Sequence, residues 1–236
     1  MTEPTATTAP VAWVLGAGRE PGRTLAQALA QRGFRLALYD LNPGALEATA
    51  GQVRPHAAAE PLLLHGDPVR KIALQALLNQ IEDHWARLDL IVYALEANPA
   101  AGLRALDEWD WHRALDINLT VPWLLAQMAA RVMQGGLVAF VGGEEPLHAP
   151  PDEAGLALRA ARGGLLAAVP QWAEMLAPQR VRLHLLLPRR PYDPLWRAVA
   201  RPARAIWLRE PPPTLPALLL RLWEEPLTGL VLYAGR

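Results

Sequence analysis

Short apolar runs alternate with longer amphipathic segments along almost the whole chain of 236 residues. Apolar runs of about four to eight residues are typical of strands that are buried on both faces of a sheet. The longer segments have the spacing of helices that cross over such a sheet. The alternation therefore predicts an α/β fold with a parallel sheet. The expected strands cover residues 11–15, 35–40, 62–65, 88–95, 137–141, 181–187 and 230–233.

Helices are expected between these strands, at residues 23–31, 43–53, 68–87, 107–133 and 151–176. Gly33 and Gly135 follow two of them and are the predicted helix stops, while Asp107 is a predicted N-cap. Pro170 lies inside the last helix and is expected to kink it, because proline removes one backbone hydrogen bond.

This order of strands and helices requires only one domain. We predict a Rossmann-type, doubly wound parallel sheet of about seven strands at residues 11–236, with helices on both faces. Residues 1–10 are rich in Thr, Pro and Ala and are expected to form a flexible tail. Residues 188–216 are rich in Pro, Arg and Trp without a clear period, and short covering helices are expected there.

The composition excludes several kinds of catalytic chemistry. The chain has no cysteine and no serine, and Lys71 is its only lysine. Disulfides, thiolate nucleophiles, cysteine-ligated metals and a serine hydrolase triad are thereby excluded. Lys71 lacks the neighbours that a phosphate-binding loop or a Schiff-base lysine needs. The six histidines have no metal-binding spacing, so no metal site is expected.

The charges of the chain are balanced, with 23 basic and 23 acidic residues. No broad positive field is therefore expected to attract nucleic acid or an anionic membrane. The sequence has neither the pattern of a signal peptide nor an uninterrupted apolar run of about 18 residues. We expect a cytoplasmic protein without nucleic-acid or membrane partners.

A glycine-containing turn follows the first expected strand and precedes the first helix. Gly16, Gly18 and Gly22 would let the backbone approach a pyrophosphate, whose charge would face the helix N-terminus. Asp40 closes the second strand, where a carboxylate can bond the hydroxyls of an adenosine ribose. The order of strand, turn, helix, strand and acid thus predicts a dinucleotide site. Asp40 favours NAD, because its charge would repel a 2′-phosphate.

These features resemble the short-chain dehydrogenase/reductase family over nearly all of residues 11–235. The family's turn reads Thr-Gly-x-x-x-Gly-x-Gly; residues 15–22 match its first and last glycines and have Glu20 in place of the middle one. Asp67 is similar to the family's adenine-contacting Asp. Asn118 is similar to the helix Asn that anchors an active-site water. Further similarity lies in segments 108–110, 115–120, 176–178, 181–188 and 227–232.

The resemblance implies a Rossmann fold that binds NAD(H) or NADP(H), and it also exposes a conflict at the turn. Arg19 sits where many NADP-using relatives have Arg, whereas Asp40 favours NAD. Glu20 would place a carboxylate near the diphosphate and repel it, unless Arg19 or Arg23 neutralises that charge. Binding of no nucleotide therefore remains an open alternative.

The family's catalytic groups are absent at the positions that match them. The family uses a Tyr-x-x-x-Lys pair and a Ser, and these fall on Leu158, Arg162 and either Gly142 or Gly143. Leucine cannot transfer a proton, and glycine has no side-chain donor. Arg162 keeps the positive charge and could hold a ribose, but its pKa stays above about 12. No catalytic residue is assigned.

Other polar side chains near the expected cleft are candidates for a substitute acid or base. Tyr93 follows a central strand, Glu144, Glu145 and His148 follow the next, and Tyr192 lies in the covering segment. Each also has a simpler structural explanation. Tyr93 would fill space, the two glutamates would be solvated, His148 would cap a loop and Tyr192 would pack its ring.

Three hypotheses follow from this sequence. The first is a family member with a degenerate active site that binds a dinucleotide weakly and acts without catalysis. The second is an atypical NAD(P)-dependent oxidoreductase whose acid or base lies outside the usual positions. The third is a structural subunit that forms a homo-oligomer, or a hetero-oligomer with an active relative, through helices 107–133 and 151–176.

Overall fold

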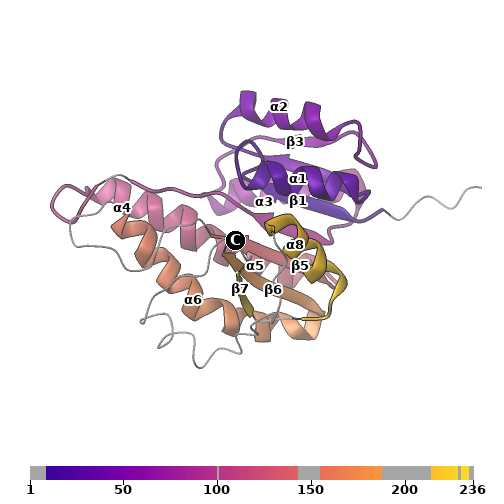
Figure 1. Cartoon of the computed structure of the whole chain (residues 1–236). Coiled ribbons are helices and arrows are strands. Elements are labelled where there is room, and N and C mark those ends of the chain that lie inside the picture. The colour runs from indigo at the N-terminus through magenta and orange to yellow at the C-terminus, as the bar shows by residue number, and fades with distance from the viewer. Residues whose placement is uncertain (1–8, 100, 143–154, 188–213, 228–229, 234–236) are drawn as a thin grey trace, which may run out of the picture.

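The computed structural model describes residues 9–99, 101–142, 155–187, 214–227 and 230–233 (Figure 1). Within these residues one sheet has seven parallel strands in the order β3-β2-β1-β4-β5-β6-β7. The strands are β1 (Val11–Leu15), β2 (Arg35–Tyr39), β3 (Leu62–Leu64), β4 (Leu90–Tyr93), β5 (Gly136–Val141), β6 (Val181–Leu187) and β7 (Leu230–Tyr233). The strand order reverses between β1 and β4, as in a Rossmann fold.

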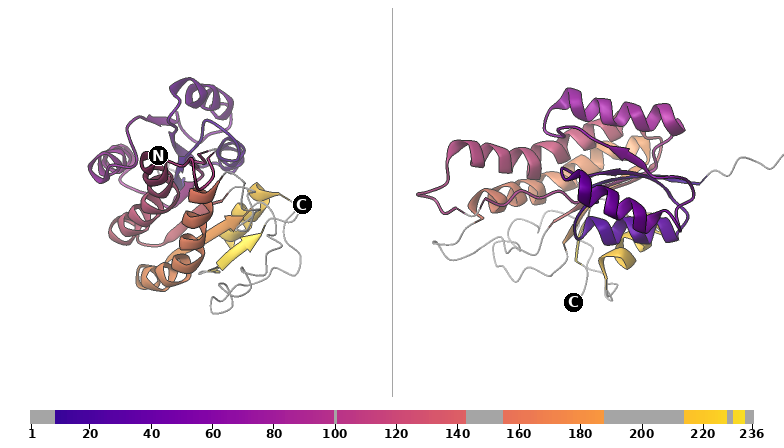
Figure 2. Two further views of the ribbon diagram at one scale, coloured as in Figure 1. Left: turned by 90° about the vertical axis from the view of Figure 1, so that its left-hand side faces the viewer. Right: turned by 90° about the horizontal axis from the view of Figure 1, so that it is seen from above.

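Helices cover both faces of this sheet, so the expected doubly wound α/β architecture is confirmed (Figure 2). They are α1 (Gly22–Gln31), α2 (Pro43–Val53), α3 (Lys71–Trp85), α4 (Glu108–Leu115), α5 (Val121–Val132), α6 (Leu156–Leu176) and α8 (Leu215–Glu224), with a π-helical turn at Asp116–Thr120 and a 3₁₀ turn at Ala177–Gln179. α1, α2 and α8 pack on one face, and α3, α5 and α6 on the other.

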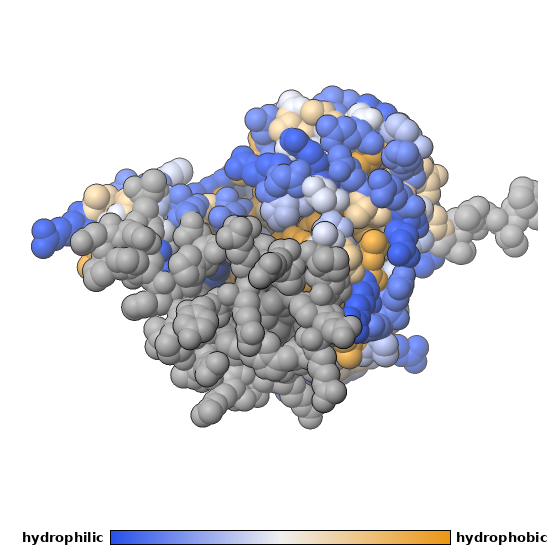
Figure 3. All heavy atoms as spheres, viewed as in Figure 1, coloured by the Kyte–Doolittle hydropathy of each residue, from blue (hydrophilic) through white to orange (hydrophobic). Residues whose placement is uncertain are grey.

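The alternating side chains of β1 join the two layers of the core. Val11, Trp13 and Leu15 belong to the cluster under α3, α5 and α6, whereas Ala12 and Val14 belong to the cluster under α1, α2 and α8. All five side chains are fully buried. The outer surface over α1 and α2 is mostly hydrophilic (Figure 3), as expected for amphipathic helices. None of the helices in the described residues is both long and apolar enough to span a bilayer.

The expected helix at 107–133 is interrupted by a π-helical turn. Asp107 is the N-cap, as predicted, and its carboxylate accepts the amide of Asp110 at 2.7 Å. The regular helix then widens at Asp116–Thr120 before α5 begins. Pro122 accounts for this change, because a proline ring clashes with the carbonyl four residues earlier in a regular helix. The sequence analysis did not consider Pro122.

Some other boundaries differ from the expectations. α3 begins at Lys71 instead of residue 68, because the amide of Val69 donates to the carboxylate of Asp67 and forms a turn. β4 covers four residues of the expected strand 88–95. Pro170 lies inside α6, and the kink stays a prediction. The expected tail and the covering helices fall almost entirely at residues outside the described ranges.

α8 was not expected, and it depends on an arginine from β6. The guanidinium of Arg182 donates to the carbonyls of Leu222 and Glu225, and to that of Trp223 at 3.1 Å. These carbonyls lie at the C-terminal end of α8, where a helix has no internal donors for them. Burial lowers the pKa of Arg182 from its ordinary value. The side chain therefore fixes α8 to the sheet.

We predict that Arg182→Met destabilises the protein by about 2–4 kcal/mol, because it leaves half-buried carbonyls without donors. Urea unfolding followed by circular dichroism measures the change. Arg131→Met is the matched control, since Arg131 is exposed on α5, and it should change stability by less than about 0.5 kcal/mol. Equal effects of the two substitutions would contradict this role.

Candidate functional site

The candidate site lies where the strand order reverses, at the carboxyl ends of β1 and β4. The turn after β1 comprises residues 16–22, and the segment after β4 comprises residues 94–99. The two meet at Gly16, whose φ is +92°. A Cβ on Gly16 would lie 2.7 Å from the carbonyl carbon of Ala94. Only glycine fits this contact.

The carboxylate of Asp40 is buried beneath the turn, with the residue 3% exposed. One oxygen accepts the amide of Gly18 and the other accepts the amide of Asn42, both at 2.9 Å. A Cβ on Gly18 would lie 2.6 Å from the carboxyl carbon of Asp40. The expected bond from Asp40 to a ribose stays a prediction. The hydrogen bonds to Gly18 and Asn42 oppose it, because both carboxylate oxygens already have donors within the protein.

Glu20 caps the first turn of α1. Its carboxylate accepts the hydroxyl of Thr24 at 2.6 Å and the amide of Thr24 at 3.3 Å. From the sequence, neutralisation of this charge by Arg19 or Arg23 was the condition for binding a diphosphate. The guanidinium of Arg23 instead donates to the carbonyl of Gly18 at 2.5 Å and to the hydroxyl of Thr49 at 3.3 Å. Arg19 is exposed.

Asp67 lies at the edge of the site next to β3 and is partly exposed. Arg113 of α4 approaches its carboxylate at 3.4 Å. The neighbouring Gly66 accepts the hydroxyl of Tyr39 at 2.6 Å. Burial, with the charges of Asp67 and Asp40, raises the pKa of Tyr39. The side chain of Asp67 is 47% exposed, so it stays accessible, and its adenine-binding role stays a prediction.

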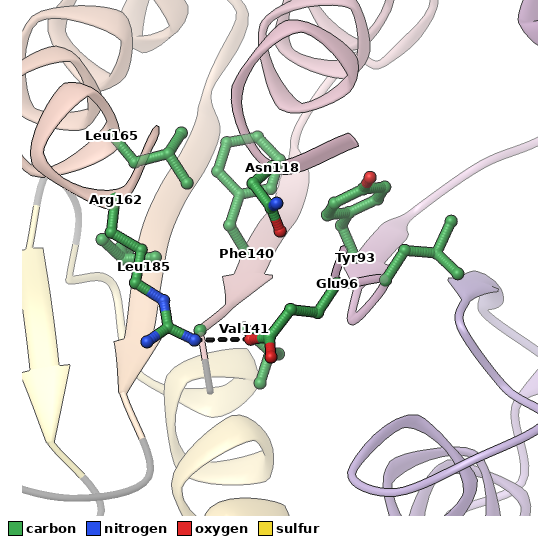
Figure 4. Close-up of a pocket in the computed structure, with 10 residues that line it drawn as sticks. Tyr93, Glu96, Asn118, Phe140, Val141, Arg162, Leu165 and Leu185 are labelled. Atoms are coloured by element: carbon green, nitrogen blue, oxygen red, sulfur yellow. Dashed lines mark hydrogen bonds and ion pairs between the residues drawn. The ribbon is translucent and has the colours of Figure 1, made fainter. Parts of the chain in front are cut away.

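The two positions that the resemblance predicts for the family's Tyr and Lys lie one turn apart on α6. Leu158 is 1% exposed and has no group that could carry a proton. The side chain of Arg162 is 6% exposed, and its guanidinium lies 2.5 Å from the carboxylate of Glu96 (Figure 4). No role for Glu96 was expected from the sequence. The signal in the sequence that could have indicated this ion pair was a charged residue shortly after a buried strand.

Tyr93 holds its proton inside the protein. Its hydroxyl donates to the carbonyl of Ile117 at 2.5 Å. Burial raises the pKa of Tyr93 well above the ordinary value of about 10. A phenol with this pKa and this acceptor is a poor general acid or base. This geometry fits a Tyr93 ring that fills space in the core better than it fits a catalytic role.

Asn118 lies in the π-helical turn and fastens the segment after β4. Its side-chain amide donates to the carbonyls of Ala97 and Ala114 at 2.7 and 2.8 Å. Its side-chain oxygen faces the amide of Ala97 at 3.3 Å. Both donor hydrogens are thus engaged within the protein. This arrangement supports a packing role for Asn118, and its role in anchoring an active-site water stays a prediction.

A small cavity lies between these groups. Its volume is about 20 Å³, and Tyr93, Glu96, Asn118, Arg162 and the aliphatic Leu165 belong to its lining (Figure 4). Such a volume holds about one water molecule.

Gly142 also belongs to the cavity's lining. Five sequence candidates lie outside the residues that the structure describes: Gly143, Glu144, Glu145, His148 and Tyr192. Among the described residues, no group of three or more His, Asp or Glu side chains could hold a metal ion.

Comparison with known proteins identifies the family. A family model described as enoyl-(acyl carrier protein) reductase matches residues 16–203. The chain belongs to the short-chain dehydrogenase/reductase family. The 3-oxoacyl-[acyl-carrier-protein] reductase of Mus musculus is 27% identical over 177 residues, which cover 74% of this chain and 72% of the relative. Sorbitol dehydrogenase of Cereibacter sphaeroides is 27% identical over a segment that covers 53% of this chain and 47% of the dehydrogenase.

Solved short-chain dehydrogenase/reductase structures have the same fold. NAD⁺-bound xylitol dehydrogenase superposes with a TM-score of 0.77 at 21% identity, over 95% of this chain and 96% of that one. A short-chain dehydrogenase/reductase from Burkholderia xenovorans superposes with a TM-score of 0.76 at 23% identity, over 96% of this chain and 94% of its own. The family resemblance that the sequence indicated is therefore confirmed.

We predict that the buried tyrosines make the protein less stable above pH 10. A raised pKa in the folded state means that the unfolded chain ionises first, so the stabilisation is complete below about pH 10 and declines above it. Urea unfolding between pH 8 and 11 measures this decline. Tyr93→Phe should flatten it by up to about 1.4 kcal/mol per pH unit. Identical slopes for the variant and the parent chain would show that Tyr93 ionises freely when folded.

We predict that Glu96→Gln destabilises the protein by about 1–3 kcal/mol, because it removes the counter-charge of the buried Arg162. Thermal unfolding measures this loss. Glu174→Gln removes an exposed carboxylate from the same helix as Arg162 and serves as the control. A loss no larger than that of the control would mean that the ion pair does not stabilise the site.

Proposed function

We propose that this chain is a non-catalytic member of the short-chain dehydrogenase/reductase family. The observation that carries the proposal is the pair of substitutions on α6. Leu158 stands where the resemblance predicts the tyrosine acid, and Arg162, in place of the lysine, is paired with Glu96 at 2.5 Å. A reaction that moves a hydride to a carbonyl also needs a proton donor. Leucine supplies none.

The neighbouring polar groups give further support. The hydroxyl of Tyr93 is bonded to Ile117, and the side-chain amide of Asn118 is bonded to Ala97 and Ala114. Each donor thus has an internal acceptor and would have to break that bond to serve a substrate. The Arg162 guanidinium stays protonated near neutral pH, because arginine keeps a pKa above about 12. It cannot replace the missing acid.

An assay of hydride transfer tests this proposal. The full chain is mixed with NADH or NADPH and with a panel of 3-oxoacyl thioesters, ketoses and simple ketones, and absorbance at 340 nm is followed. The mouse 3-oxoacyl-[acyl-carrier-protein] reductase, assayed in parallel, is the positive control. We expect no rate above the background without protein. Turnover of any substrate would overturn the proposal and favour the atypical oxidoreductase hypothesis, with its acid or base outside the described residues.

Exposed aromatic side chains favour a role as a structural subunit. Trp109 on α4 and Trp123 on α5 are 71% and 44% exposed. α4 lies beside α6 and extends beyond the strands of the sheet (Figure 1). Large exposed apolar side chains on such a surface are typical of protein–protein contacts. We propose that α4 and α5 form a contact with a second copy, or with an active relative.

We predict that the chain sediments as a dimer or larger, and that the double variant Trp109→Asp/Trp123→Asp shifts it to a monomer. Charged side chains in an apolar contact lose their hydration without gaining a partner. Analytical ultracentrifugation measures the change. Ile72→Asp, which alters a side chain 87% exposed on α3, should leave the association intact. A parent chain that sediments as a monomer would rule out self-association, and hetero-association would then need an active relative in the mixture.

A further inference from the structure

The phosphate end of the dinucleotide cleft is a separate question from the reaction end, which the proposed function concerns. A bound diphosphate needs backbone amides that are not already engaged, at the glycine turn and in the first turn of the following helix. Relatives in this family bind NAD(P)(H), so the donors that this chain offers decide whether it fits such a ligand.

The first turn of α1 offers few donors. Pro21 is its N-cap residue and has no amide hydrogen. The amide of Arg23 donates to the carbonyl of Arg19 at 2.9 Å. The amide of Thr24 donates to the carboxylate of Glu20 at 3.3 Å, and the Thr24 hydroxyl donates to the same oxygen. The Glu20 carboxylate thus takes the place of an anion at this helix N-terminus.

Three amides of the glycine turn are engaged as well. Those of Gly16 and Ala17 both donate to the carbonyl of Tyr39, at 2.8 and 3.0 Å. That of Gly18 donates to the buried carboxylate of Asp40. The space that a Cβ on Gly18 would fill is taken up by that carboxylate. The glycine at this position is therefore explained by Asp40, without a ligand.

The charges around the turn oppose a diphosphate. Glu20 lies in the turn and Asp40 contacts its Gly18 amide, so two carboxylates lie at the turn, and like charges repel. Arg23 could compensate them, but its guanidinium is bonded to Gly18 and Thr49. Arg19 is exposed and is the remaining cation of the turn.

At the end of the cleft where the nicotinamide would lie, a cation of the chain is likewise paired with a carboxylate of the chain. Arg162, which the resemblance assigns to the ribose, has Glu96 as its acceptor. Glu96 and Arg162 also belong to the lining of the small cavity beside this pair. At both ends of the cleft, a carboxylate of the chain occupies the donor that a dinucleotide would use.

We infer that Glu20, Asp40 and Glu96 close the dinucleotide cleft from within, so that the chain takes up neither NAD(H) nor NADP(H). The residues present do not fit the family's cofactor. The fold is then complete without a ligand and gains no stability from one, whereas a protein that binds its cofactor is stabilised in proportion to ligand concentration.

Titration of the full chain with NADH and NADPH tests the inference, with energy transfer from tryptophan to the nicotinamide as the readout. We expect dissociation constants above about 1 mM for both. The double variant Glu20→Gly/Pro21→Ala removes the internal carboxylate and supplies an amide hydrogen. It should bind at least about tenfold more tightly than the parent chain. Glu20→Gln removes only the charge, and it should increase the affinity for NADH and NADPH by less than the double variant does.

Glu47→Gln is the control, since it removes an exposed carboxylate from α2, and it should bind no better than the parent chain. Circular dichroism and the melting temperature are recorded for each variant, so that misfolding is recognised. A parent dissociation constant below about 100 μM would overturn the inference. A folded double variant that binds no better than the parent chain would overturn the closing role of Glu20.

These outcomes are distinguishable from those of the proposed function. A chain that binds NADH tightly but transfers no hydride would overturn the closed cleft and leave the non-catalytic role standing. A chain that transfers hydride would overturn both. A chain that binds neither cofactor supports the closed cleft, whatever the outcome of the oligomer experiment.

Discussion

The hydrogen bond between the Asp40 carboxylate and the Gly18 amide is the contact on which the site depends. A carboxylate that is 3% exposed needs donors for its oxygens, and the turn after β1 supplies one of them. The bond ties the end of β2 to the glycine turn and leaves no room for a side chain at Gly18. Asp40, which the sequence pattern predicts to bind a ligand, thereby stabilises the protein itself.

The same principle links the substitutions at the reaction end. A guanidinium as deeply buried as that of Arg162 is costly without a counter-charge, and Glu96 provides that charge from the segment after β4. Asn118 then fastens this segment to the π-helical turn through Ala97. The polar groups around this ion pair are bonded within the protein as well, Tyr93 to Ile117 and Asn118 to Ala97 and Ala114. These contacts therefore couple α6, the segment after β4 and the π-helical turn.

Much of the fold could be predicted from the sequence, because its parallel strands are buried on both faces and read as apolar runs. Strands such as β1 and β6 have the expected bounds. The π-helical turn could not be predicted from helical periodicity, which does not detect the clash at Pro122. In the site, the pairing of Arg162 with Glu96 joins residues 66 positions apart. Sequence spacing carries no information about such a contact, and the internal partner of Asp40 was missed for the same reason.

In the proposed closed cleft, the amides of Gly18 and Thr24 are already bonded to the carboxylates of Asp40 and Glu20. Amide hydrogen exchange at Gly18 and Thr24, measured by NMR with and without several millimolar NADH, tests it most directly. The account predicts that the Gly18 amide exchanges slowly in the free protein, because its acceptor is buried, and that NADH changes neither rate. Fast exchange of Gly18 in the free protein, or slowing of either amide when NADH is added, would contradict the account.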